Sequence, residues 1–430
     1  MFTLTLKKNH DHRFNSGHPW IYSNELGKIP RDLKPGEVAQ LVDCHGNFLA
    51  FGYAHPNSLI SFRVLTRNIK DDEPLRGDAI FKKLLKAYNW RRKSGLTKLS
   101  YRLVFGEADG LPGLVIDRFR TKSHQVFVVE PHTAGMDASA SEIENALHMF
   151  ILHTHEKFSE PALQLSEIIL KSNAHHRTLE GLEMAESRFV KKVIDELEDT
   201  SILVASPFDE NEPVEFFVNL LDGQKTGFFL DQFRNVQIAA HWIRKLEWNK
   251  KQVIRILDLF CYVGQWSVQL ARILCQLGYD CEVSFVDASQ SALDMAQRNL
   301  KSAGVKKCIP VKLDIVKDLD KMPADHFDLV ICDPPALIKR RKDIPQGERA
   351  YLKLFSMALN RLKTGGFFVA ASCSGLLQQD VFFQTLGKAK KRAKKEIHWL
   401  SQGEQAADHP VTMEFPEGNY LKCLMGICDG

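Results

Sequence analysis

The sequence predicts an α/β protein in which a doubly wound, mostly parallel sheet follows two smaller units. From about residue 206 to the C-terminus, apolar strand patterns alternate with helical patterns, which is typical of a parallel sheet. The first seventy residues instead contain short strand patterns separated by turns, which fits a small β-barrel. A length of 430 residues allows two or three domains. We therefore predict three domains, at residues 1–70, 71–205 and 206–430.

Each predicted domain has its own set of elements. In the N-terminal domain we expect strands at residues 4–6, 38–42, 48–53 and 60–65, with a hairpin turn at 45–47. The middle domain has α+β character, with helices expected at residues 78–93, 138–157 and 179–197 and strands at 101–105, 114–117 and 125–129. In the C-terminal domain a hairpin and a helix at 232–247 precede strands at 253–257, 282–286, 327–332 and 366–371, with helices between them.

Cysteine usage and hydropathy predict a cytoplasmic protein. The nine cysteines are scattered without a CxxC pair, so neither a disulfide framework nor a zinc site is expected. The N-terminus runs directly into a strand pattern, and no apolar run is long enough to span a bilayer. We therefore expect no membrane partner and no metal, whereas a monomer and a homodimer both stay open.

The net charge of +4 is too small to identify a partner, but two basic runs stand out. Residues 339–342 directly follow a predicted strand end, so we expect Lys339 and Arg340 to contact phosphates. Residues 388–395 form a denser basic run. For that run, a solvated helix face and a nucleic-acid contact are equally consistent with the pattern.

Acidic residues at two strand ends predict a cofactor site. Asp258 and Gly264 bracket the loop after the first strand of the C-terminal domain, and Asp287 ends the second strand. Ligands of doubly wound sheets bind at these carboxyl ends, where an acid suits a ribose diol. NAD is disfavoured because the GxGxxG motif that cradles a pyrophosphate is absent. S-adenosylmethionine has no phosphate and carries cationic groups that favour nearby acids, although both acids could instead cap local structure.

A carboxylate and a thiol follow the last two predicted strands. Asp333 precedes Pro334 and Pro335, whose rings make the exit from that strand rigid, and Cys373 lies between two serines. Methylating carbon 5 of a pyrimidine requires such a pair, because a thiolate added to carbon 6 turns the ring into a nucleophile and a carboxyl group steadies its nitrogen. We therefore predict that Cys373 is a nucleophile, whereas Cys332, inside its strand, belongs to the core.

Several runs together resemble one known family, over nearly the whole chain. The matching stretches are residues 17–23, 102–114, 180–182, 225–232, 258–264, 333–335, 372–375, 406–410 and 416–422. The family that they resemble comprises bacterial methyltransferases that make 5-methylcytosine in 23S ribosomal RNA, with a PUA domain before a Rossmann-like, class I methyltransferase domain.

The resemblance implies roles for individual residues. It makes Cys373 the nucleophile and places Asp333 near the target base of 23S RNA. It also implies contacts with S-adenosyl-L-methionine, which we expect from Phe229, Gln232, Asp258, Phe260, Gly264, Asp287 and Asp314. In the barrel, Arg13, with Lys7 and Lys8, is expected to contact RNA phosphates.

The chain departs from the family pattern at a few positions. Ala336 and Leu337 stand where a lysine and an aromatic residue usually follow the two prolines, Gln265 replaces a glycine, and Phe233 replaces an arginine. Because Ala336 cannot stack on a base, methylation of a base amine is disfavoured. Two other functions stay open: non-covalent methylation of another RNA base, and an inactive RNA-binding assembly factor. A third, a small-molecule methyltransferase, is disfavoured by the N-terminal barrel and the basic runs.

Overall fold

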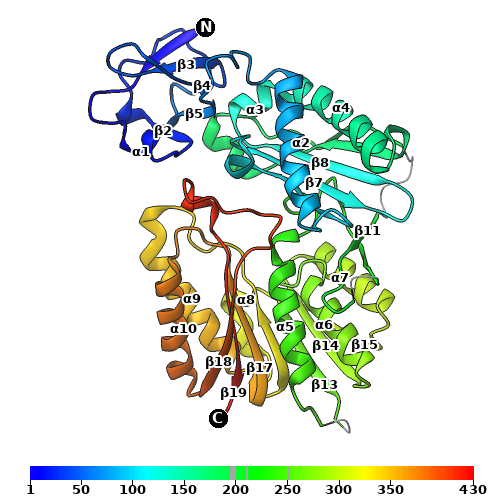
Figure 1. The fold of residues 1–430 in the computed structure, drawn as a ribbon. Helices are drawn as coiled ribbons and strands as arrows, with labels where there is room; N and C mark the ends of the chain where they lie inside the picture. The colour runs from blue at the N-terminus through cyan, green and yellow to red at the C-terminus, as the bar shows by residue number, and fades with distance from the viewer. Residues whose placement is uncertain (194–199, 210–211, 250–251) are drawn as a thin grey trace. The chain divides into compact units, whose positions relative to one another are not determined.

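The chain forms two compact units in the computed structural model, which describes residues 1–430 except 194–199, 210–211 and 250–251 (Figure 1). The first unit comprises Met1–Thr200, Asn219–Phe228 and Asp408–Gly418. The second unit comprises Ser201–Val218, Phe229–Ala407 and Asn419–Gly430. Two short segments from the C-terminal half of the chain therefore belong to the first unit.

The N-terminal part of the first unit is a small sheet of short strands. Its strands pair in the order β1-β3-β4-β5-β2, in which β1 and β3 are parallel and the other pairs antiparallel. The elements are β1 (Phe2–Thr5), α1 (His12–Asn15), β2 (Trp20–Tyr22), β3 (Val38–Val42), β4 (Phe48–Ala54) and β5 (Ile60–Thr66). Gly52 permits the close pairing of β4 with β5, because a Cβ there would lie 2.1 Å from the carbonyl oxygen of Arg63. The four predicted strands are present, and the three-residue β2 was not predicted.

The remainder of the first unit is a mixed sheet with helices. The strands pair in the order β10-β9-β8-β7, and β6 also pairs with β7. Apolar residues of the sheet and of α2 and α4 form one buried cluster that includes Leu84, Ile116 and Phe150. The elements are α2 (Gly77–Lys93), β6 (Tyr101–Phe105), β7 (Leu114–Arg120), β8 (Gln125–Pro131), α3 (Ala134–Ala138), α4 (Ala140–Phe158), β9 (Ser166–Leu170) and β10 (Arg188–Lys191).

One helix prediction in this unit is wrong. Residues 179–197 were expected to be helical, but Arg188–Lys191 forms strand β10, which pairs antiparallel with β9. Residues 194–199 of that prediction lie outside the described residues. The helical periodicity of this segment reflects only its local sequence. Backbone hydrogen bonds to β9 stabilise the strand conformation instead, and this tertiary pairing outweighs the local helical preference.

A buried charge network holds the C-terminal segment Asp408–Gly418 in the first unit. Arg102 forms two hydrogen bonds of 2.7 Å to the Asp117 carboxylate, and its backbone N–H donates to Asp408 Oδ2 at 2.8 Å. Arg91, which is fully buried, pairs with Asp109 and donates to the Asp408 carbonyl oxygen. Buried charges require such partners. The matching runs 102–114 and 406–410 therefore meet in one structural network.

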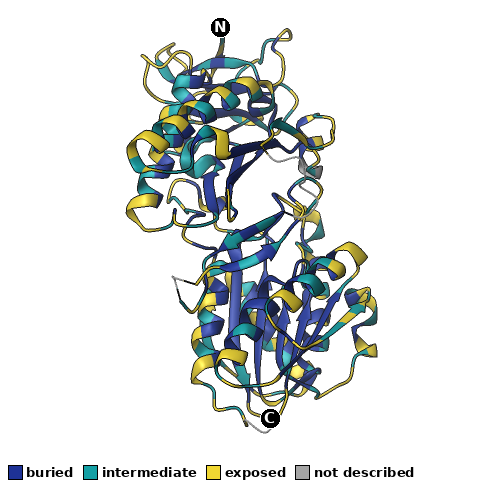
Figure 2. Ribbon diagram, turned by 90° about the vertical axis from the view of Figure 1, so that its right-hand side faces the viewer, coloured by how far each residue is buried: buried dark blue, intermediate teal, exposed yellow. Residues whose placement is uncertain are grey.

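The second unit is built around a single sheet whose strands are buried between helices (Figure 2). The strands pair in the order β15-β14-β13-β16-β17-β19-β18; the first five are mutually parallel, and β19 is antiparallel to both of its neighbours. A hairpin of β11 (Ser201–Val204) and β12 (Val214–Phe217) precedes the sheet. The remaining elements are α5 (Phe233–Lys245), β13 (Ile254–Leu259), α6 (Gln265–Gln276), β14 (Cys281–Asp287), α7 (Gln290–Ser302), β15 (Lys307–Lys312), α8 (Ile315–Asp318), β16 (Phe327–Cys332), α9 (Ile344–Leu359), β17 (Leu362–Ser372), α10 (Gln379–Ala393), β18 (Ile397–Gly403) and β19 (Lys422–Cys428).

The order of strands fixes where a ligand can bind. The chain runs from β13 outward through β14 to β15, then returns to the other side of β13 for β16 and β17. The reversal lies between β13 and β16, and in such sheets the crevice beyond the carboxyl ends at this point is the ligand site. The central strands are mainly apolar and buried, and Cys332 belongs to the core as predicted.

Candidate active site

The carboxyl ends of four parallel strands bring the predicted site residues to one edge of the sheet. Asp258 and Asp287 lie at or next to the ends of β13 and β14, whereas Asp333 and Cys373 directly follow β16 and β17. Parallel neighbours share the same edge. This edge is therefore the candidate active site.

The loop after β13 has an unusual backbone. Phe260, Tyr262 and Gly264 all have positive φ angles, of 63°, 49° and 80°. The loop is held to β14, because the N–H groups of Phe260 and Cys261 donate to the Val286 carbonyl oxygen at 2.9 and 3.1 Å. Residues other than glycine adopt this conformation at a cost that surrounding structure must outweigh, and such strain concentrates at functional sites.

Asp258 is a buried carboxylate with one unpaired oxygen. Its Oδ2 accepts a hydrogen bond of 3.2 Å from the Ser267 N–H, whereas Oδ1 has no hydrogen-bond partner among the described residues. Burial raises the pKa of Asp258 to about 7, the bonds from Ser267 lower it, and the charges of Asp333 and Asp287 raise it further. A buried acceptor without a donor is costly unless a ligand supplies one. The site thus offers a cationic or donor group a carboxylate oxygen.

Asp287 is held in place by backbone donors. Its Oδ1 accepts from the Ser289 N–H at 2.9 Å, and its Oδ2 accepts from the Tyr262 N–H at 3.2 Å. Beside it, the rings of Phe229 and Tyr262 meet edge to face, with centroids 5.2 Å apart. An oriented carboxylate near aromatic surfaces is suited to a ribose diol and an attached flat base.

Asp314 lies at the same edge, but its carboxylate is exposed. It follows β15 and precedes α8, and the N–H of the preceding Leu313 donates to the Asp287 carbonyl oxygen at 3.1 Å. Its carboxylate forms an ion pair of 2.8 Å with Lys317, and this hydrogen bond lowers the pKa of Asp314. Backbone contact therefore ties Asp314 to Asp287, while its side chain pairs within its own helix.

Asp333 is oriented by two neutral donors on one oxygen. Gln232 Nε2 donates to Oδ2 at 2.8 Å and Trp266 Nε1 donates to the same atom at 3.1 Å. Gln232 is in turn positioned by Asn235, whose Nδ2 donates to Gln232 Oε1 at 2.7 Å. Gln232 was predicted as a cofactor contact, and it also links α5 to Asp333. Trp266 is buried, and its indole N–H contacts a predicted catalytic residue.

Cys373 lies next to the two prolines that follow Asp333. Its Sγ donates to the Pro334 carbonyl oxygen at 3.9 Å, and its side chain is only partly buried. Strands β16 and β17 are neighbours, with Cys332 paired to Ala370. The predicted thiol and carboxylate thus lie on adjacent strand ends.

Both serines beside Cys373 are buried in a hydroxyl cluster around Tyr351. Ser372 Oγ donates to Tyr351 Oη at 2.9 Å, and the Oη and Ser374 Oγ atoms are 2.8 Å apart. Ser374 Oγ also accepts from the Ile338 N–H at 3.2 Å. Tyr351 is thus a core residue, and its hydroxyl connects the Cys373 segment with the loop after the prolines. No pattern in the sequence indicated that connection.

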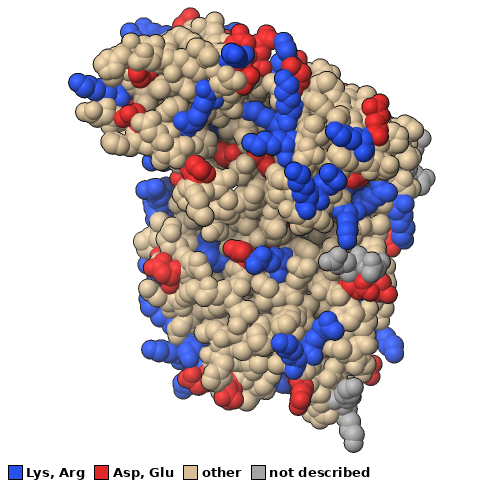
Figure 3. Space-filling model, viewed as in Figure 1, with Lys and Arg blue, Asp and Glu red and all other residues tan. Residues whose placement is uncertain are grey.

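The residues predicted to contact RNA phosphates lie in different parts of the chain. Lys339 and Arg340 are exposed, in the loop between Asp333 and α9. Arg13 belongs to the first unit, where its Nε lies 3.5 Å from Glu25 and its guanidinium is 4.6 Å from the centre of the Tyr22 ring. Basic and acidic side chains are interspersed on the face shown in Figure 3. The structure therefore leaves Lys339 and Arg340 more available to a partner than Arg13.

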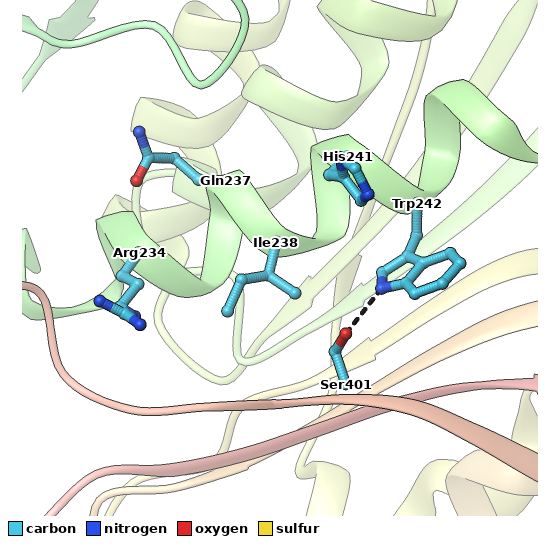
Figure 4. Close-up of a pocket in the computed structure, with 6 residues that line it drawn as sticks. All are labelled: Arg234, Gln237, Ile238, His241, Trp242 and Ser401. Atoms are coloured by element: carbon cyan, nitrogen blue, oxygen red, sulfur yellow. Dashed lines mark hydrogen bonds between the residues drawn. The ribbon is translucent and has the colours of Figure 1, made fainter.

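A separate pocket of about 380 Å³ opens on α5 and β18 (Figure 4). It contains none of the predicted site residues, and its lining comprises Arg234, Gln237, Ile238, His241, Trp242 and Ser401. Its indole donor is already satisfied, since Trp242 Nε1 donates to Ser401 Oγ at 2.8 Å, and Arg234 lies 3.5 Å from Glu404. With these polar groups paired internally, the pocket indicates no particular ligand.

Two classes of feature are absent from the described part of the chain. No group of three or more histidine, cysteine, aspartate or glutamate side chains there is arranged to hold a metal ion. No helix there is both long and apolar enough to cross a bilayer.

Comparison with known proteins defines the class of this protein. Residues 4–67 match the model of a PUA-like domain, and residues 250–414 match that of a methyltransferase domain. Among solved structures, the crystal structure of SMU.776, complexed with SAH, superposes with a TM-score of 0.74 at 18% identity, over 99% of this chain and 100% of that one. A second structure, described as "a putative sam-dependent methyltransferase from Streptococcus mutans", gives a TM-score of 0.73 at 18% identity with the same coverage. The chain thus has a PUA-like domain and a class I methyltransferase fold, which confirms the predicted fold class.

Its curated relatives identify the family. Proteins of Yersinia pseudotuberculosis and Yersinia pestis, both named ribosomal RNA large subunit methyltransferase I, are 32% identical to it over 427 residues, which is 97% of each chain. The chain belongs to the ribosomal RNA large subunit methyltransferase I family. The predicted family and the predicted cofactor, S-adenosylmethionine, are confirmed at this level. The unpaired Asp258 oxygen and the oriented Asp287 carboxylate fit that cofactor. The cofactor has no phosphate, so its loop does not need the several glycines that cradle a pyrophosphate, and the loop after β13 contains one glycine.

Proposed function

We propose that this protein methylates carbon 5 of a cytosine in the RNA of the large ribosomal subunit, 23S RNA, through a covalent adduct with Cys373. One observation carries the proposal: a partly buried thiol and an oriented carboxylate lie on adjacent strand ends, with Cys373 Sγ against the backbone of Pro334. The names of the curated relatives support ribosomal RNA as the substrate.

The first chemical step follows from the position of Cys373. Its thiolate adds an electron pair to carbon 6 of the ring, and the electrons of the carbon 5–carbon 6 double bond become available at carbon 5. S-adenosylmethionine supplies the electrophilic methyl group and leaves as S-adenosylhomocysteine. Asp333, held by Gln232 and Trp266, takes up a proton before the attack, and its protonated carboxyl group donates a hydrogen bond to the ring nitrogen on which negative charge builds.

The second step restores the ring. The proton on carbon 5 passes to a base in the solvent, the electrons of that bond re-form the double bond, and Cys373 leaves carbon 6 with its electron pair. The target base must leave its stack to reach both side chains. We assign phosphate contacts to Lys339 and Arg340 beside this site, and to Arg13 in the PUA-like domain.

The covalent step is tested with RNA that carries 5-fluorocytidine. Fluorine cannot leave as a proton does, so the elimination stalls and the enzyme stays bonded to the RNA. With S-adenosylmethionine present, a denaturing gel of labelled large-subunit RNA fragments is expected to show a retarded band for the wild type. Mass spectrometry of nucleosides from the unfluorinated RNA is expected to show 5-methylcytidine.

Two substitutions make the test specific. Cys373→Ala is expected to abolish both the band and methylation, whereas Cys332→Ala, in the buried core, is expected to keep the band. A Cys373→Ala enzyme that still methylates would refute the covalent mechanism and favour non-covalent methylation of a base. Binding of RNA and cofactor without any methylated nucleoside would favour an inactive assembly factor.

A further inference from the structure

A buried lysine lies beside the proposed nucleophile. Lys422 is the first residue of β19, where it pairs with Ser372 of β17 in the antiparallel register. Its side chain is buried, and Nζ donates a hydrogen bond of 2.7 Å to the carbonyl oxygen of Ser374. Cys373 stands between these two serines, so the ammonium group is anchored next to the thiol's own backbone.

The ammonium group of Lys422 lacks the counter-ion that a buried lysine normally has. In the described part of the chain, no carboxylate forms an ion pair with it, and the Ser374 carbonyl is its hydrogen-bond acceptor. Burial lowers the pKa of Lys422 to about 8, and the charge of Cys373 acts in the opposite direction. An unpaired buried cation is unfavourable. A thiolate on Cys373 would supply the missing negative charge.

We propose that Lys422 is a positioning residue that holds Cys373 as a thiolate before RNA binds, through the charge of its ammonium group. The inference rests on the proposed role of Cys373 as nucleophile. Lys422 keeps its proton throughout, and the proton of the thiol passes to water. Because a thiolate, and not a thiol, attacks carbon 6, the enzyme then meets its substrate with the nucleophile already formed.

Other charged groups around the thiol act differently. In its ionised form, Asp333, beyond the end of β16, disfavours the thiolate. Tyr351, from α9, is neutral at physiological pH, because burial raises its pKa and the charge of Cys373 adds to that effect. Lys339 and Arg340 favour the thiolate, but they are exposed and screened by salt. Lys422 is therefore the buried cation that can offset Asp333.

The test measures the ionisation of Cys373 without RNA. Full-length protein is pulsed with iodoacetamide between pH 5.5 and 10, and alkylation of the Cys373 peptide is quantified by mass spectrometry. In the wild type we expect half-maximal reactivity below pH 8.5, about the pKa of an isolated thiol. Lys422→Gln removes the charge but keeps a hydrogen-bond donor, and we expect it to lower the alkylation rate at pH 7 about tenfold, a shift of about one pKa unit.

Three controls make the outcome decisive. Lys422→Arg keeps the charge and is expected to retain the wild-type profile, and the exposed Cys44 in the first unit is expected to react identically in all proteins. The reciprocal measurement, the NMR titration of the Lys422 ammonium group, is expected to move to lower pH in Cys373→Ser. A Lys422→Gln profile that matches the wild type, or an unchanged Lys422 titration, overturns the proposal. Neither result bears on whether 5-fluorocytidine traps the enzyme, so the two hypotheses fail separately.

Discussion

The hydroxyl of Tyr351 provides a direct test of how the fold positions Cys373. Tyr351→Phe removes one oxygen atom and leaves the ring and its packing in place. That oxygen accepts from Ser372 Oγ at 2.9 Å, lies 2.8 Å from Ser374 Oγ and is 3.4 Å from the Leu337 nitrogen. The substitution therefore disconnects both serines beside Cys373 from α9.

The expected loss of stability follows from the hydrogen bonds that the two serines keep when the Tyr351 hydroxyl is removed. Ser374 Oγ still accepts from the Ile338 N–H, and Ser372 Oγ still accepts from the Ser374 N–H at 3.3 Å. The hydroxyl of Ser372, which is fully buried, loses its acceptor. An unsatisfied buried hydroxyl costs about 1–3 kcal/mol. In a unit of roughly 200 residues this corresponds to a decrease in Tm of about 2–12 °C.

Two measurements check this prediction. Calorimetry follows the transition that S-adenosylhomocysteine shifts upward, which belongs to the methyltransferase unit, and a methylation assay follows the rate. Because Cys373 loses part of its support, we expect methyl transfer to slow about 10-fold to 100-fold. Tyr53→Phe is the matched control: its buried hydroxyl also makes two hydrogen bonds, to Pro112 and Thr133, but in the first unit, and it is expected to leave the melting transition of the methyltransferase unit unchanged. If Tyr351→Phe melts within about 1 °C of the wild type and methylates at the wild-type rate, the hydroxyl cluster does not position Cys373.

Three further predictions concern the cofactor and RNA. Asp287→Ala removes an oriented carboxylate. Because a hydrogen bond to a charged group contributes about 1.5–3 kcal/mol, calorimetric titration with S-adenosylhomocysteine is expected to show about 10-fold to 150-fold weaker binding. Wild-type affinity would contradict the ribose assignment. Asp258 has a folded-state pKa of about 7, above its ordinary value of 3.8, so the cofactor-free wild type is expected to lose stability as the pH rises from about 4 to about 7. Asp258→Asn is expected to remove that loss in thermal melts, and identical pH profiles would count against the buried, unpaired carboxylate. Replacing both Lys339 and Arg340 with alanine is expected to change the salt dependence of RNA binding. The magnitude of the slope of log affinity against log salt concentration is expected to fall by about 1.4–1.8, since each phosphate contact contributes about 0.7–0.9. An unchanged slope would mean that the two side chains contact no phosphate.

The sequence by itself determined the class of fold and the chemical groups of the site. Alternation of strand and helix patterns predicted the parallel sheet, and the acids and thiol at strand ends predicted one shared edge, because parallel strands place their carboxyl ends together. These features are local along the chain. Gly264, with its positive φ, is a further example, since the turn it makes depends on glycine's own conformational freedom.

Tertiary structure alone decided which side chains serve the site residues. Trp266, Tyr351 and Lys422 read as ordinary core or strand positions, and they acquire their roles only when α6, α9 and β19 pack beside Asp333 and Cys373. The same is true of β10, whose strand conformation depends on pairing with β9. The position of the segment Asp408–Gly418 also depends on distant partners, because Asp408 is hydrogen-bonded to buried residues that lie 306 and 317 positions earlier in the sequence. Hydrogen bonds between distant segments cannot be predicted from sequence periodicity. The periodicity of each segment reflects its own helix or strand, and it is the same whichever segment packs against it.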